Sequence, residues 1–197
     1  MVLLQGKIHG DASEAVRTRT YDIVQQIAEH NEAVQAMLTR NDIILLIQVQ
    51  PGVGDQETRV KFTGNNRTGI TIALFREDDD SDDVLVENLL HELVLHAEPA
   101  TKKHLAAVAN NEAPEYPSSD DDDAIEAEEQ AEHEDDRAWY RMADIALRFD
   151  SQTFEKSIFD ASSHDKDVAV KVLNRLVQAN RINQQYAEEL EEVIFEE

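Results

Sequence analysis

Residues 82–98 contain the side chains whose types and spacing are best suited to chemistry. His91, Glu92 and His96 lie within a run of leucine and valine that keeps helical spacing and is apolar around nearly its whole circumference. We expect such a helix to be buried, and two imidazoles and a carboxylate are costly to bury unless each finds a strong partner. A metal ion would satisfy all three together. The alternative is that Glu92 and His96 form a hydrogen-bonded pair at the edge of the core, with His91 donating to a carbonyl.

This stretch resembles the zincin metallopeptidases, whose helix carries the pattern H-E-x-x-H. The resemblance implies that His91 and His96 bind Zn²⁺ and that Glu92 is catalytic, as the general base on a zinc-bound water that attacks a peptide bond. Here the run from His91 to His96 is one residue longer. In an α-helix, at about 100° per residue, the two histidines would lie about 140° apart, and Glu92 and His96 would be aligned instead. A π-bulge between the histidines, or a helix that ends near Leu95 and turns His96 inward, would bring them together.

The third metal ligand must come from another part of the chain. We choose His133, because it is the next imidazole on a strongly helical stretch and has Glu129 and Asp136 nearby to orient its ring. The other candidates are His104, Glu98 and Glu129. A further interpretation keeps the metal but makes it structural, tying the central helix to the helix of His133.

The composition limits the partners and ligands. The chain has 42 acidic and 18 basic residues and a formal net charge of −24, which argues against nucleic acid or an anionic membrane as a partner and favours a basic protein. It has no cysteine, so any metal ligands are nitrogen or oxygen atoms. The acidic stretch of residues 76–83 lacks the spaced aspartates and central glycine of a calcium loop, so we do not expect it to bind calcium.

The first ten residues have too short an apolar run and no basic lead-in for a secretory signal. We therefore expect a soluble chain that is cytoplasmic when synthesised and that a secretion system independent of signal peptides could export. Small domains with an H-E motif and no signal peptide resemble the effector or toxin modules that bacteria inject.

The order of the patterns predicts an α+β fold. A long helix over residues 11–39 is followed by strands at 43–50 and 57–63, which we expect to pair as a hairpin, and by a third strand at 70–75. We expect a three-stranded, mostly antiparallel sheet, with the buried metal-site helix against one face.

The C-terminal half is predicted to be all helical. Pro99 is expected to end or bend the central helix, and a short helix follows at residues 101–109. Residues 111–123 read as a flexible acidic loop, because they can bury almost nothing to offset their ordering entropy. Residues 124–197 are expected to complete the same domain as the α+β core of residues 1–110.

Two functions follow from these observations. The first is a zinc-dependent hydrolase, a peptidase of zincin type that acts on a protein or peptide. The second is a non-enzymatic acidic interaction protein, such as an inhibitor or an immunity-type partner, whose histidines are structural and whose charge docks a basic surface.

Overall fold

A computed structural model describes residues 8–40, 44–51, 60–66, 69–76, 81–112 and 136–196 of the chain. The chain forms two compact units, Met1–Asp121 and Asp122–Glu197, whose boundary lies in the acidic stretch of residues 111–123. The first unit combines a sheet with helices, and the described part of the second is helical. The α+β class is thus confirmed, while the prediction that residues 124–197 complete one domain with the first unit stays a prediction.

Within the described residues, the sheet of the first unit has four strands in the order β1-β2-β4-β3. Their bounds are Ile8–Gly10, Ile44–Gln50, Gly69–Phe75 and Val60–Asn66 in that order. The β1–β2 and β2–β4 pairings are parallel, and the β3–β4 pairing is antiparallel. The predicted mostly antiparallel sheet is therefore wrong, and so is the hairpin between residues 43–50 and 57–63, because β4 lies between those strands.

The side chains of β2 and β4 explain why these two strands lie inside the sheet. Both strands are nearly continuous apolar runs, which is typical of parallel strands that are covered by other elements. The strand side chains that are fully or almost fully buried are Leu45, Ile47, Val49, Ile70, Ile72 and Leu74. The three-residue strand β1 was not predicted, because it is too short to show an alternating pattern.

Gly10 ends β1 in a conformation that requires glycine. Its φ is +140°, and a Cβ atom at this position would lie 1.7 Å from the carbonyl oxygen of Val49 on β2. Any side chain would therefore push the two paired strands apart.

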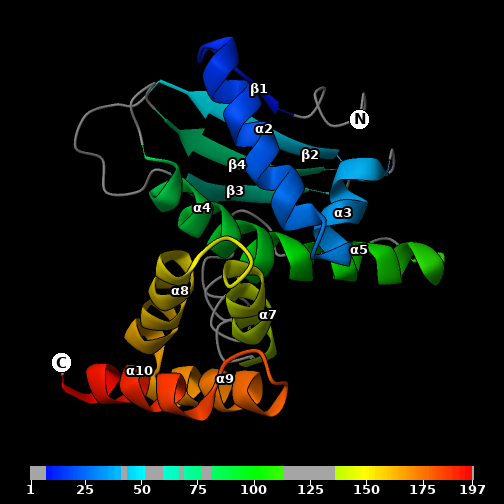
Figure 1. Ribbon diagram of the computed structural model, residues 1–197. Helices are drawn as coiled ribbons and strands as arrows, with labels where there is room; N and C mark the ends of the chain where they lie inside the picture. Colours follow the sequence, from blue (N-terminus) through cyan, green and yellow to red (C-terminus); the bar gives the residue numbers. More distant parts are fainter. Residues whose placement is uncertain are drawn as a thin grey trace. The chain divides into compact units, whose positions relative to one another are not determined.

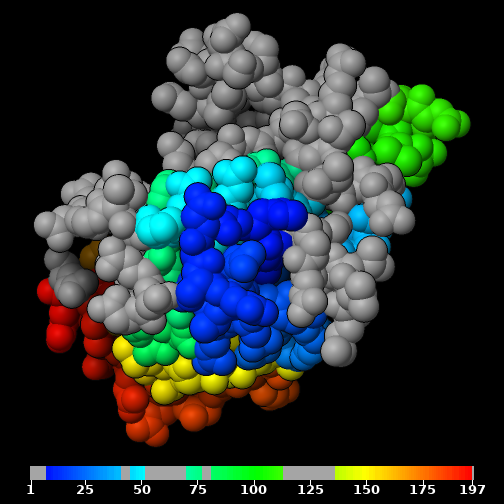
Figure 2. All heavy atoms as spheres, turned by 90° about the horizontal axis from the view of Figure 1, so that it is seen from above, coloured from blue at the N-terminus to red at the C-terminus, as the bar shows by residue number. Residues whose placement is uncertain are grey.

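The predicted long first helix is wrong, because it is two helices, α2 (Glu14–Ala28) and α3 (Glu32–Thr39). Asn31 makes the break: its Oδ1 accepts hydrogen bonds from the backbone N–H groups of Ala33 and Val34, both at 3.0 Å, and so caps α3. Figure 1 shows α2 lying across the sheet, and in Figure 2 its blue atoms lie beside the cyan atoms of the strands.

The second unit contains four described helices. They are α7 (Asp136–Ala146), α8 (Ser151–His164), α9 (Lys166–Gln178) and α10 (Gln184–Glu196). Helices α7, α8 and α9 pack on one another around Trp139 and Phe154, which are almost fully buried, and α10 packs on α8 and α9. For the described residues the all-helical prediction is confirmed. Most of the predicted flexible loop, residues 113–123, lies outside them.

Candidate metal centre on a π-helix

The candidate residues lie on a continuous helical rod made of three segments. It starts as α4 (Asp82–Leu90), continues as the π-helix η1 (His91–Ala97) and ends as α5 (Glu98–Ala109). The rod contacts β3 through α4 and η1, and it contacts α2 and α3 along its length. Pro99 was expected to end or bend the helix. It stands in the first turn of α5, directly after η1.

The π-helix is a local change of hydrogen bonding at the predicted motif. The N–H of Glu98 donates to the carbonyl of Leu93, five residues earlier, instead of to the residue four earlier. Pro99 has no N–H to donate to Leu95, and in a regular α-helix its ring would clash with that carbonyl. An α-helical register is therefore disfavoured at this point, and the π-turn accommodates the one extra residue.

The π-turn brings the two histidines together. Because its hydrogen bonds join residues five apart, His91 and His96 lie one turn apart on the same side of the rod. Their ring centroids are 5.2 Å apart, with the ring planes inclined at 49°. Both side chains are half-buried, while Leu93, Val94 and Leu95 between them are fully buried. Of the two arrangements that the sequence left open, the π-turn is the one present.

The spacing of the imidazoles suits two ligands of one zinc ion. With a ring nitrogen about 2.1 Å from zinc, each ring centroid lies roughly 3.2 Å from the ion, so two tetrahedral ligands have centroids about 5 Å apart. The centroid separation of His91 and His96 matches this value. The pair therefore fits two of the ligands that a zinc site needs.

A third ligand is not found among the residues that the structure describes, where no group of three histidine or carboxylate side chains could hold a metal ion. His133, our predicted third ligand, and Glu129 both lie outside the described residues. His104 is buried on α5, and Glu98 is engaged with Asn31 and Lys102. Glu92, the predicted base, follows His91 directly on η1 and is half-buried.

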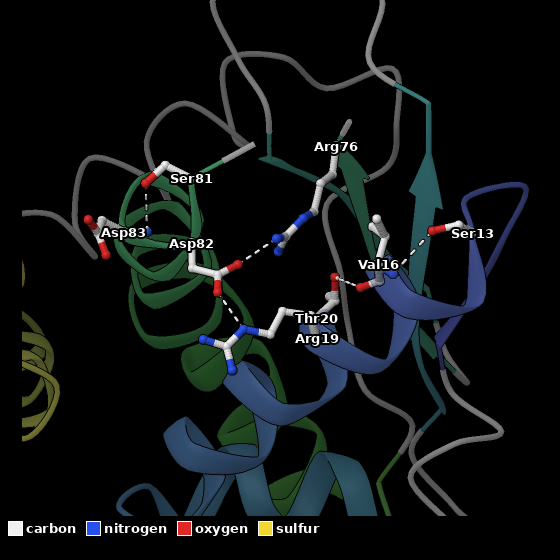
Figure 3. Close-up of polar contacts among 8 residues, drawn as sticks. All are labelled: Ser13, Val16, Arg19, Thr20, Arg76, Ser81, Asp82 and Asp83. Atoms are coloured by element: carbon white, nitrogen blue, oxygen red, sulfur yellow. Dashed lines mark hydrogen bonds and ion pairs between the residues drawn. The ribbon is translucent and has the colours of Figure 1, made fainter. Parts of the chain in front are cut away.

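The start of the rod is held by an ion-pair cluster around Asp82 (Figure 3). Its Oδ1 accepts a hydrogen bond from Nη2 of the buried Arg76 at 2.5 Å, and its Oδ2 accepts one from Nε of Arg19 on α2. Burial acts to raise the pKa of Asp82, but the hydrogen bonds and charges of Arg76 and Arg19 together outweigh it, so the pKa is lowered. The same pairing raises the pKa of Arg19.

The far end of the π-turn is held by Glu98, whose side chain is almost fully buried at 1% exposure. Asn31 donates from Nδ2 to Oε2 of Glu98 at 2.5 Å, and Lys102 pairs with Oε1. Glu98 was considered from its sequence position only as a metal ligand, and neither its bonds to Asn31 and Lys102 nor the Asp82 cluster was predicted. The four-residue spacing of Glu98 and Lys102 does predict an ion pair on a helix. No local pattern links Asn31 to Glu98, which are 67 residues apart.

In the comparisons with known proteins, no family model, curated protein or solved structure matches the chain. None of the described helices is both long enough and apolar enough to cross a membrane.

Proposed function

We propose that the protein is a zinc-dependent hydrolase of peptidase type, with His91 and His96 as two of the zinc ligands and Glu92 as the general base. The observation that carries the proposal is the π-turn. The motif is one residue longer than in zincins, and the π-turn still brings its two histidine rings to a separation suited to binding one zinc ion. A π-turn is rare and is frequently found at functional sites.

Each side chain has a distinct role in this proposal. Bound zinc would supply Lewis acidity, which makes a water easier to deprotonate and polarises a carbonyl. His91 and His96 hold the ion through ring nitrogens. Glu92 accepts the proton of the attacking water and returns it to the leaving amine. The third ligand is proposed to be His133.

The arrangement of the sheet supports an extended peptide as substrate. In the described sheet β3 is an edge strand, and it contacts η1, which carries the histidines. A peptide that adds to the outer edge of β3 by backbone hydrogen bonds would run beside the site. The net charge of −24 favours a basic peptide over an acidic one.

Zinc titration of metal-free protein tests the proposal. We expect one tight equivalent in the wild type, which His91→Ala and His96→Ala each abolish. Glu92→Gln should keep the zinc but lose hydrolysis of a peptide mixture, because a base is not a ligand. His30→Ala, which removes an exposed histidine of the same unit, is the matched control and should bind zinc like the wild type.

The same titration separates the two functions. Weak binding that His91→Ala leaves unchanged would contradict the hydrolase and favour the acidic interaction protein. Tight zinc in the wild type with no hydrolysis of any peptide would favour the structural metal.

A further inference from the structure

The two polar anchors of the helical rod are held by neighbouring helices. Asp82, at the start of α4, is bound by Arg19 of α2, and Glu98, at the start of α5, is bound by Asn31, the cap residue of α3. Helices α2 and α3 are consecutive, and both contact the rod. The rod must therefore present both carboxylates to the same layer of helices.

An uninterrupted α-helix would not meet this requirement. Asp82 and Glu98 are 16 positions apart, which is 98 minus 82. At about 100° per residue they would point about 160° apart, on nearly opposite sides of the rod. A π-turn inserts one residue without advancing the helix, so the effective separation is one position shorter and the angle falls to about 60°. The two anchors can thus be satisfied together only when the π-turn is present.

We propose that the Asn31–Glu98 hydrogen bond, together with the Asp82 ion pairs at the other end of the rod, holds the π-turn in place. The π-turn in turn positions His91 and His96 as a metal-binding pair. Glu98 and Asn31 are positioning residues, since they hold the backbone that carries the histidines. The link to metal rests on the proposed function, whereas the effect on the spacing of residues 91 and 96 does not.

Because Glu98 is buried, its anchor favours the π-turn over an α-helical register. A carboxylate that is 1% exposed loses its hydration, so the donors of Asn31 and Lys102 are needed to satisfy it. Relaxing the π-turn to α would rotate Glu98 by about 100° and remove it from Asn31. The Oε2 atom would then lose its donor, and this loss opposes the rotation. Asn31 links the anchor to the fold, since its other side-chain atom caps α3.

An exchange of donor and acceptor tests the proposal. Asn31→Asp keeps a good cap for α3 but replaces the donor with a carboxylate that repels Glu98. The double variant Asn31→Asp with Glu98→Gln restores one hydrogen bond with the direction reversed. Asn31→Ser is the milder variant should Asn31→Asp fail to fold, because serine caps the helix and cannot reach Glu98. Ser13→Asp, a matched change of the cap residue of α2, is the control.

Two measurements are made in each background. The first is the zinc dissociation constant, which should rise roughly 10- to 100-fold in Asn31→Asp or Asn31→Ser and recover in the double variant, as for other residues that orient metal ligands. The second needs no metal: His91→Cys with His96→Cys creates the chain's sole thiols, and a short bis-alkylating reagent that spans one helical turn bridges them. Bridging should be fast in the parent and in Ser13→Asp, slow in Asn31→Asp, and fast again in the double variant.

The outcomes separate this proposal from the proposed function. Equal bridging rates in all backgrounds, with only the thermal stability changed, would overturn the positioning role. Absence of zinc from the wild type would overturn the proposed function, and the bridging rates would still decide whether Asn31 and Glu98 hold the π-turn.

Discussion

Deleting Leu95 should turn the π-turn into an ordinary α-helical turn and leave both ends of the rod in place. The π-turn holds one residue more than an α-helix, so removing one residue leaves Asp82 and Glu98 at the same angle of about 60°. His91 and His96 then stand four positions apart, about 40° apart around an α-helix, which is the spacing of the zincin motif. The deletion should therefore keep the pair of histidines.

The cost of the deletion can be worked out from burial. Leu95 is fully buried, and burying a leucine side chain contributes about 1.5–3 kcal/mol. The helix closes over the deleted position, so no large cavity is left, in contrast to a leucine-to-alanine change, which costs about 2–5 kcal/mol. Pro99 would then stand in an α-helical register, which costs about 3 kcal/mol. Together with about 2 kcal/mol of lost leucine burial, we expect the free energy of unfolding to fall by about 5 kcal/mol, as measured by urea denaturation. The zinc dissociation constant, measured by titration, should stay within a few-fold of the wild type.

Deletion of Glu87 is the matched control. Glu87 is only half-buried, so its loss removes less apolar surface than the loss of Leu95. It also lies between Asp82 and Glu98, but its deletion leaves His91 and His96 five positions apart. Keeping both anchors would then require an α-helical turn that separates the histidines by about 140°. Zinc binding should be lost when Glu87 is deleted and kept when Leu95 is deleted. Loss of zinc in both deletions, from a wild type that binds it, would refute the π-turn argument.

Three further predictions concern stability. Because the pKa of Asp82 is lowered in the folded state, its contribution is fully present above its unfolded pKa of about 3.9 and is lost as the pH falls through the folded value. Asp82→Asn should therefore be destabilising at neutral pH and show a shallower loss of stability in acid, read from urea midpoints; an unchanged acid profile would contradict the ion pairs. Gly10→Ala should weaken the β1–β2 pairing, because its Cβ would meet the Val49 carbonyl; faster amide exchange at residues 8–10 checks this, and wild-type exchange would refute it. Trp139→Ala should cost about 3–5 kcal/mol, whereas Phe195→Ala, at a site 59% exposed, should change little; equal thermal shifts would place the helical core elsewhere.

The apolar pattern was a good guide to which segments are helices or strands and a poor guide to how they pair. Burial of Leu45, Ile47 and Val49 follows from the apolar run of residues 43–50. The insertion of β4 between β2 and β3 does not, because hydrophobic pattern shows which face of a strand is buried and is silent on its neighbours. The break between α2 and α3 depended on one asparagine whose cap competes with helix continuation.

The candidate site divides in the same way. The sequence by itself determined which groups are available for chemistry: two imidazoles and a carboxylate in a buried helix, with no cysteine to compete for a metal. It also showed that the two histidines are one residue too far apart to align on an α-helix. Only the tertiary structure decided that the extra residue is taken up by a π-turn. Pro99 disfavours an α-helical register, but the sequence alone does not show whether the helix ends near Leu95 or takes a π-turn. Asp82 and Glu98 decide it, because both must reach partners on α2 and α3 that are distant in the sequence.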